Sequence, residues 1–184
     1  MMCRKTIGFW SIILLAVLWV SGCAFFQSGK TESWFQRQSA RVIAVLDFEQ
    51  EGFVEGGKLG VFAADELTSA LFIRKKVDVV DRSQIKAKIM EKGLHPNVMD
   101  NKAIQELGRI LNADCLILGK ITEMSGIDIG LEEEQKHRIQ ITFRLISTSS
   151  GEVIGMVSQE VAKKGEARQI VGKMLHNMAK KVKL

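Results

Sequence analysis

Two nearly continuous apolar runs constrain the fold more than any other feature of the sequence. The first covers residues 41–48 (Arg-Val-Ile-Ala-Val-Leu-Asp-Phe), and the second covers residues 115–121 (Cys-Leu-Ile-Leu-Gly-Lys-Ile). Runs of this length, without alternation between apolar and polar residues, are typical of strands that are buried on both faces. The sequence therefore predicts a sheet with helices packed on it.

Four segments carry apolar residues at the spacing of an α-helix. The first is residues 59–75 and the last is residues 166–181. The second is capped by Asp81 or Ser83 and has Ile85, Ile89 and Met90 on one face. The third is capped by Asp100, and its apolar stripe consists of Ile104, Leu107, Ile110 and Leu111. The capping residues are of the types whose side-chain oxygens accept hydrogen bonds from the first free amides of a helix.

Three further strands complete the prediction. Residues 77–80 form a short strand, and the alternating residues 137–147 predict a half-exposed antiparallel strand. A tight turn at 147–151 leads into the hairpin partner, residues 152–160. Loops are expected at 49–58, 93–99 and 123–136. The order β-α-β-α-α-β-β-β-α predicts an α/β (α+β) fold with a mixed β-sheet and packed helices.

The N-terminus has the layout of a signal peptide. Arg4 and Lys5 precede the uncharged residues 7–20, a run shorter than the roughly 20 residues that a spanning helix needs. The run ends in Val20-Ser21-Gly22-Cys23, which resembles the lipobox of bacterial lipoprotein precursors. The small residues let an extended backbone enter a signal peptidase, and the sulfur of Cys23 would carry the lipid. An ordinary membrane anchor with a chance cysteine is the alternative.

The lipobox predicts three parts: a signal peptide at 1–22, a lipidated N-terminus and tether at 23–40, and one periplasmic domain at 41–184. Ala24 follows the cysteine, where an Asp would favour retention in the inner membrane, so the outer membrane is expected. The polar residues 24–40 show no period and could reach roughly 55–60 Å when extended. Residues 24–31 fit a relaxed Walker A pattern, but no buried strand precedes it and no helix follows it, so no nucleotide site is expected.

Charge and cysteine content argue against a nucleic-acid-binding protein and against a fold held by disulfides. Removing residues 1–22, which hold two of the 26 basic residues, leaves a net charge of 24 − 21 = +3. This mild excess in an exported protein does not indicate a nucleic-acid partner. After processing, Cys115 is the one cysteine besides Cys23, so no internal disulfide can form and stability must come from the core.

Several motifs, in this order, resemble the curli-assembly lipoprotein (CsgG-like) family. They are residues 42–48, Val79-Val80-Asp81-Arg82, Glu106-Leu107-Gly108, residues 113–121 and the turn at 145–153. The resemblance covers residues 41–160. It implies a fold related to the periplasmic activators of penicillin-binding proteins and to the anticodon-binding-domain-like N-terminal domain of TolB. The family's secretion channel uses two long membrane hairpins, whose strands need about 9–11 residues each. Residues 92–101 and 123–136 are too short and polar for this, so no pore is expected.

No residue pattern indicates catalysis, a metal or a cofactor. Asp47, Asp81 and Arg82 could line a site, but they are expected to cap helices and tie loops together. His95, His137 and His176 lack metal-ligand spacing, and Cys115 in its apolar strand is interpreted as a buried structural thiol. Gly56, Gly57 and Gly60 do not form a dinucleotide-binding fingerprint.

The basic C-terminus allows two interpretations. Its cationic residues are Lys163, Lys164, Arg168, Lys173, Lys180, Lys181 and Lys183. They could form a patch for anionic lipid or an acidic partner. The preferred interpretation is a helix that packs into the core through Ile170, Val171, Met174, Leu175, Met178 and Val182, with a solvated outer face.

The sequence as a whole predicts a non-enzymatic lipoprotein, anchored to the outer membrane and facing the periplasm, that binds other envelope proteins. The leading expectation is an accessory factor for cell-envelope or curli-type surface-polymer export, possible as a homo-oligomer. The alternative is an activator of a peptidoglycan synthase (a penicillin-binding protein). The tether length argues against that alternative, because such activators usually carry a long disordered one. No arrangement of residues in the sequence supports a periplasmic enzyme.

Overall fold

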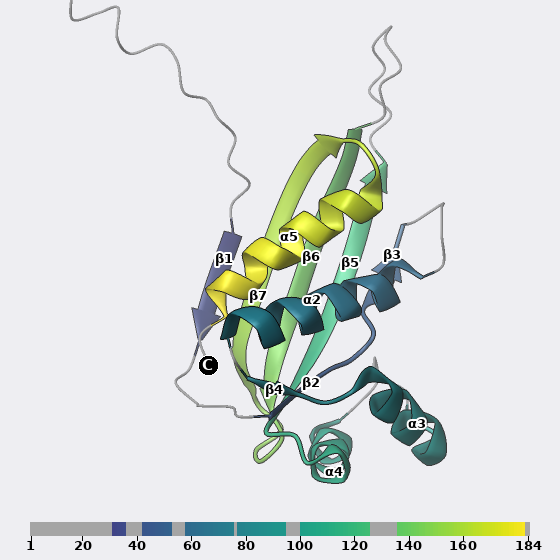
Figure 1. Cartoon of the computed structure of the whole chain (residues 1–184), viewed down its shortest axis with the longest axis vertical. Helices are drawn as coiled ribbons and strands as arrows, with labels where there is room; N and C mark the ends of the chain where they lie inside the picture. Colours follow the sequence, from purple (N-terminus) through teal and green to yellow (C-terminus); the bar gives the residue numbers. More distant parts are fainter. Residues whose placement is uncertain are drawn as a thin grey trace, which may run out of the picture.

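The fold is a mixed sheet with helices on it, as the sequence predicts. The computed structural model describes residues 31–35, 42–52, 58–75, 77–94, 100–125 and 136–182 (Figure 1). The predicted signal peptide, lipobox and sorting residue therefore lie outside the described residues. The strands are β1 (Thr31–Phe35), β2 (Val42–Val45), β3 (Glu49–Glu51), β4 (Asp78–Val79), β5 (Cys115–Ser125), β6 (Lys136–Ser147) and β7 (Val153–Lys164). The helices are α2 (Leu59–Lys75), α3 (Arg82–Lys92), α4 (Asn101–Leu111) and α5 (Ala167–Lys181).

The sheet combines parallel and antiparallel pairs. Its order is β1-β7-β6-β5-β2-β4, and β3 continues beyond β2 as a second parallel partner of β5. β2 also pairs in parallel with β4 and β5, because helical crossovers connect these strands. β5, β6 and β7 form an antiparallel meander, and β1 pairs antiparallel with the outer edge of β7.

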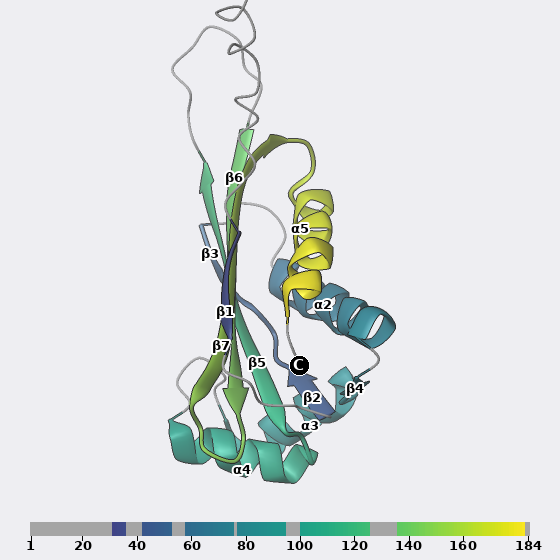
Figure 2. The same ribbon diagram turned by 90° about the vertical axis from the view of Figure 1, so that its left-hand side faces the viewer.

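The two apolar runs are buried on both faces because helices cover both faces of their strands. α2 and α5 cover one face of the sheet, and α3 and α4 lie at the lower end of the other (Figure 2). Ile43 and Ile117 belong to the core under α2 and α5, whereas their neighbours Ala44 and Leu116 belong to the core with α3 and α4. Successive strand residues point to opposite faces, so a strand between two cores needs apolar residues at every position.

The predicted helices are present with their predicted caps. α2 has the predicted bounds, Asp81 caps α3 by accepting from Ser83 N, and Asp100 caps α4 by accepting from Ala103 N. One assignment was wrong. Met90, placed on the core face of α3 with Ile85, is 83% exposed. α3 packs through Ile85 and partly through Ile89, whereas Met90, five positions after Ile85, lies about 140° around the helix and faces away from the core.

Strand pairing corrects four other expectations. The tether was expected to be irregular over 24–40, but residues 31–35 form β1. The loop expected at 49–58 contains β3. The polar segment 123–136 contributes its first residues to β5 and its last residue to β6, and β7 continues to Lys164. These strands are recognisable only from their partners, because backbone hydrogen bonds to a neighbouring strand do not require an apolar pattern.

No helix among the described residues is long and apolar enough to cross a membrane. The predicted absence of a pore depends on two other segments. The connection between β5 and β6, residues 126–135, lies outside the described residues, and so do residues 95–99.

Candidate functional site

Arg82, which the sequence marks together with Asp47 and Asp81, is the centre of a structural junction. Its Nη1 donates to Val45 O at 2.8 Å and its Nε to Asp65 Oδ1 at 2.9 Å, while Nη2 pairs with Asp47 Oδ1. The Arg82 side chain is only 14% exposed. One guanidinium thus joins the start of α3, the end of β2 and the middle of α2. This confirms the expectation that these residues tie elements together.

The remaining reactive side chains of the described region are not arranged for chemistry. Burial raises the pKa of the Cys115 thiol to about 12, so it stays protonated and is not a nucleophile at neutral pH. Within the described segments, no three His, Cys, Asp or Glu residues are placed to hold a metal ion. His176 is exposed on α5, whereas His95 and the side chain of His137 are not described.

The candidate binding site is a groove of about 240 Å³ between the end of β7 and the first half of α5. It forms because β7 extends beyond the core and Gly165, at φ +119°, reverses the chain into α5. A positive φ of this size is accessible mainly to glycine. We call this groove the basic groove, and it is lined by Gln159, Val161, Lys163, Lys164, Gly165, Glu166, Gln169, Ile170, Lys173, Met174 and Asn177.

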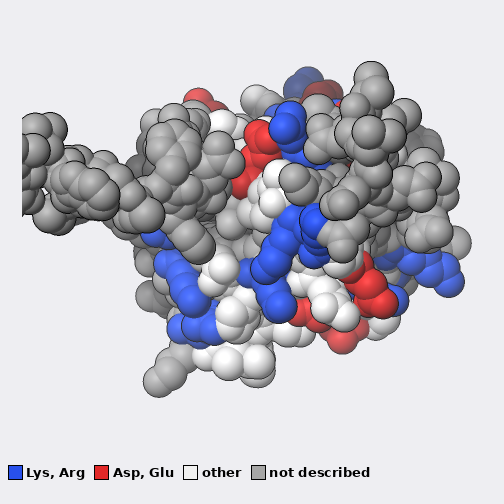
Figure 3. Space-filling view, turned by 90° about the horizontal axis from the view of Figure 1, so that it is seen from above, with Lys and Arg blue, Asp and Glu red and all other residues white. Residues whose placement is uncertain are grey.

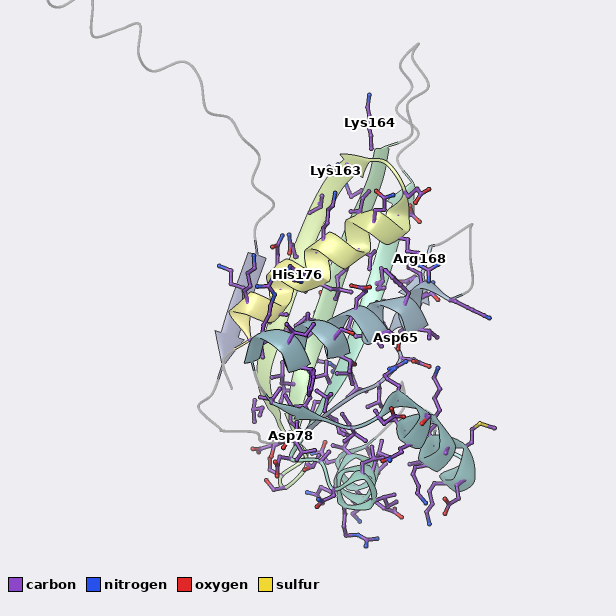
Figure 4. All side chains as sticks on the ribbon, in the orientation of Figure 1. Asp65, Asp78, Lys163, Lys164, Arg168 and His176 are labelled. Atoms are coloured by element: carbon purple, nitrogen blue, oxygen red, sulfur yellow. The ribbon has the colours of Figure 1, made fainter. Side chains whose placement is uncertain are left out.

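Cations dominate the rim of the basic groove. Lys163, Lys164 and Lys173 are all exposed, and Figure 4 shows Lys164 projecting away from the domain at the end of β7. Glu166 is the one acidic residue in the lining, and its Oε2 accepts from Gln169 Nε2 at 3.1 Å. Buried Ile170 and Met174 form part of an apolar floor. The groove can therefore bind an anionic group, but it has no constellation that could transform one.

Of two further polar side chains in this region, Gln159 lines the basic groove and Arg168 does not. Arg168, on the side of α5 toward α2, lies over the Phe62 ring at 4.4 Å and joins the two helices. Gln159 is half-buried on β7, and its Oε1 has no hydrogen-bond partner among the described residues. This oxygen is an acceptor that a donor on a bound molecule could satisfy.

The C-terminal helix packs into the core, as the preferred interpretation of the sequence expected. The sequence did not reveal which of the cationic residues lie together. All six apolar residues named for it are buried, so α5 is a core helix. Lys163 and Lys164, however, belong to β7 and meet Lys173 of α5 only through the turn at Gly165. Gln159 was also missed, because an isolated glutamine in a strand carries no sequence signal.

Comparisons with known proteins identify the family. A family model described as peptidoglycan-synthase activator LpoB matches residues 62–161, which is more than half of the chain. No curated protein matches the sequence. The match does not support the expected curli-assembly (CsgG-like) membership. It supports the related activators of penicillin-binding proteins, which the sequence offered as the alternative.

Solved structures share the fold at low sequence identity. A PelC dodecamer from Paraburkholderia phytofirmans has a TM-score of 0.58 and 15% identity over 83% of this chain and 96% of that chain. Lipoprotein GNA1162 from Neisseria meningitidis has a TM-score of 0.53 and 12% identity over 76% and 94%. The LpoB C-terminal domain from Escherichia coli has a TM-score of 0.50 and 16% identity over 67% and 84%.

The fold and the family match agree with each other. The mixed sheet and its helices are similar to the LpoB C-terminal domain, and the matched residues run from α2 to β7, through the Arg82 junction and the antiparallel meander. The chain therefore belongs to the peptidoglycan-synthase activator LpoB family.

Proposed function

We propose that this protein is a lipid-anchored, non-catalytic activator of a peptidoglycan synthase. The observation that carries the proposal is the match of residues 62–161 to the family model of peptidoglycan-synthase activators. The proposal replaces the leading expectation from sequence, an accessory factor for curli-type export, for which the comparisons give no support.

The anchor in this proposal comes from the sequence pattern at the N-terminus. Residues 1–22 are removed, Cys23 carries the lipid after recognition of Val20, Ser21 and Gly22, and the presence of Ala24 in place of an Asp favours the outer membrane. The periplasmic domain comprises residues 41–184 together with β1. Two or more acyl chains on one cysteine hold a protein firmly, whereas a single chain binds only marginally.

The arrangement of the described residues supports action through binding. A buried, protonated thiol and an ion-paired arginine provide neither a nucleophile nor a general base. An activator needs only a surface that binds the synthase better in its active state than in its inactive state. Homo-oligomers, as in the dodecameric PelC structure, remain a prediction that the mass of the detergent-solubilised protein would test.

The experiment combines binding with activity. The processed lipoprotein is purified in detergent and mixed with each peptidoglycan synthase of the same bacterium, and the rates of glycan polymerisation and peptide crosslinking are measured. We expect one synthase to be retained by the immobilised lipoprotein and to work several-fold faster in its presence. The control joins residues 1–30 to an unrelated folded domain, so that the anchor is tested without the fold. Failure of every synthase to bind or respond would refute the proposal.

A further inference from the structure

The register of β1 shows where the chain enters the domain. Thr31 lies opposite Gln159 and Phe35 opposite Gly155, in antiparallel pairing. Moving backwards from Phe35 to Thr31 therefore means moving along β7 toward Lys164. The segment between Cys23 and Thr31 joins the domain on the side of the basic groove, which is the upper end of the sheet in Figure 1.

The length of this segment limits the distance to the membrane. Thr31 follows Cys23 by eight positions, so the connection spans at most about 27 Å at the reach of an extended chain. β7 continues from Gln159 to Lys164 in the same direction, which amounts to about 17 Å at the rise of a strand. Even a fully extended tether along β7 thus leaves roughly 10 Å between Lys164 and the lipid surface, close to one Debye length at physiological salt.

The described residues of the basic groove carry the charge that an anionic surface attracts. Figure 3 looks down on it and shows Lys and Arg side chains at the left, in the middle, at the top and at the right edge of the described surface, with acidic side chains at the lower right and beside the upper group of cations. Of the two acids nearest the groove, Glu160 is paired with Arg138 at 3.7 Å, whereas Glu166 accepts only from the neutral amide of Gln169, which does not offset its charge. Juxtamembrane lysines within a Debye length are attracted to anionic lipids.

We infer that the basic groove is a membrane-docking surface that binds the anionic headgroups of phospholipids through Lys163, Lys164 and Lys173. This inference rests on the proposed lipidation of Cys23, which supplies the short anchor. Docking fixes the orientation of the domain, so that α3, α4 and the turn between β6 and β7 face away from the membrane (Figure 2). With a connection of at most about 27 Å, a synthase that binds the domain must itself extend to that end near the anchoring membrane.

The test measures orientation on the processed, lipidated protein in vesicles. Gln169→Cys places a fluorophore at the basic groove, and Lys86→Cys places one on α3 at the other end. A quencher attached to lipid headgroups reports proximity in vesicles that contain either phosphatidylglycerol or only phosphatidylcholine. We expect strong quenching at residue 169, little at residue 86, and a marked decrease at residue 169 when phosphatidylglycerol is omitted.

Charge variants separate docking from mere tethering. Replacing Lys163, Lys164 and Lys173 by Gln should lower the ratio of docked to undocked protein about 100-fold, at roughly fivefold per lysine. The matched control replaces Lys86, Lys92 and Lys102, which are exposed on α3 and α4, and should leave quenching at residue 169 unchanged. The sequence also places Glu132, Glu133 and Glu134 in the β5–β6 connection, and their replacement by Gln should strengthen docking.

Three outcomes would overturn the inference. Equal quenching at residues 169 and 86 would mean that the domain has no fixed orientation. Equal quenching with and without phosphatidylglycerol would exclude headgroup charge as the cause. Loss of synthase binding in the groove variant, with its orientation unchanged, would make the groove a protein-docking site. A protein that does not associate with vesicles at all would instead refute the proposed anchor, so the two failures are distinguishable.

Discussion

Replacing Arg82 tests whether the junction between α2, α3 and β2 is a main source of stability. Arg82→Met keeps most of the aliphatic stem and removes all three polar contacts, to Val45 O, Asp65 and Asp47. The two carboxylates are 40% and 56% exposed, so water can solvate them when the guanidinium is gone. The main loss is the charge-assisted hydrogen bond to Val45 O from a side chain that is only 14% exposed.

The expected cost follows from these exposures. A hydrogen bond involving a charged group contributes about 1.5–3 kcal/mol, and an exposed ion pair contributes ~0.2–1 kcal/mol. The free energy of unfolding should therefore fall by about 2–4 kcal/mol in Arg82→Met. Since each kcal/mol shifts Tm by roughly 2–4 °C in a domain of this size, Tm should fall by about 5–15 °C.

The assay is thermal and urea unfolding followed by circular dichroism. Arg109→Met is the matched control, because Arg109 is exposed on α4 and should change stability by less than about 0.5 kcal/mol. Arg82→Lys should recover only part of the loss, since an ammonium cannot reproduce the planar array of donors of a guanidinium. If Arg82→Met unfolds at the same temperature as Arg109→Met, the junction does not stabilise the fold and the reasoning is refuted.

Four further measurements test other parts of the molecule. Leu175→Ala, at a fully buried position, should cost about 2–5 kcal/mol, and an unchanged melt would contradict the core packing of α5. Gly119→Ala should cost about 1–3 kcal/mol in urea unfolding, because its Cβ would overlap the buried Phe48 ring, and a variant as stable as the wild type would show that the ring can move freely. Cys115 should resist alkylation at pH 8 in the native protein and react rapidly in denaturant, since burial raises its pKa to about 12; fast native reaction would show that the strand is accessible. Cys23→Ser should leave an unprocessed precursor without labelled fatty acid, and normal processing would refute the lipoprotein proposal.

The parts of the fold that follow from local chemistry were predictable. α2 has the bounds that its apolar spacing predicts, and Asp81 and Asp100 cap helices through their own side-chain oxygens. β5 was predicted from its continuous apolar run and β6 from its alternation of apolar and polar residues. Met90 was placed wrongly, because it lies about 140° around the helix from Ile85 and the face that buries Ile85 therefore leaves Met90 exposed.

The candidate site was predictable only in part. The sequence shows that the C-terminal region is basic, but Lys163 and Lys164 are on a strand and Lys173 is on a helix. Their proximity depends on the reversal at Gly165 and on the packing of α5 along β7. The sequence alone therefore left open whether these lysines form a site or only a solvated face.

The sequence by itself determined the alternation of buried strands and amphipathic helices, the helix caps and the lipobox pattern, because each depends on residues close together in the chain. Only the tertiary structure decided that residues 31–35 join the sheet, since a polar segment becomes a strand when the edge of β7 offers it backbone hydrogen bonds. That one pairing shortens the tether from roughly 55–60 Å to about 27 Å. It thereby places the basic groove at the end of the domain from which the chain leads back to Cys23.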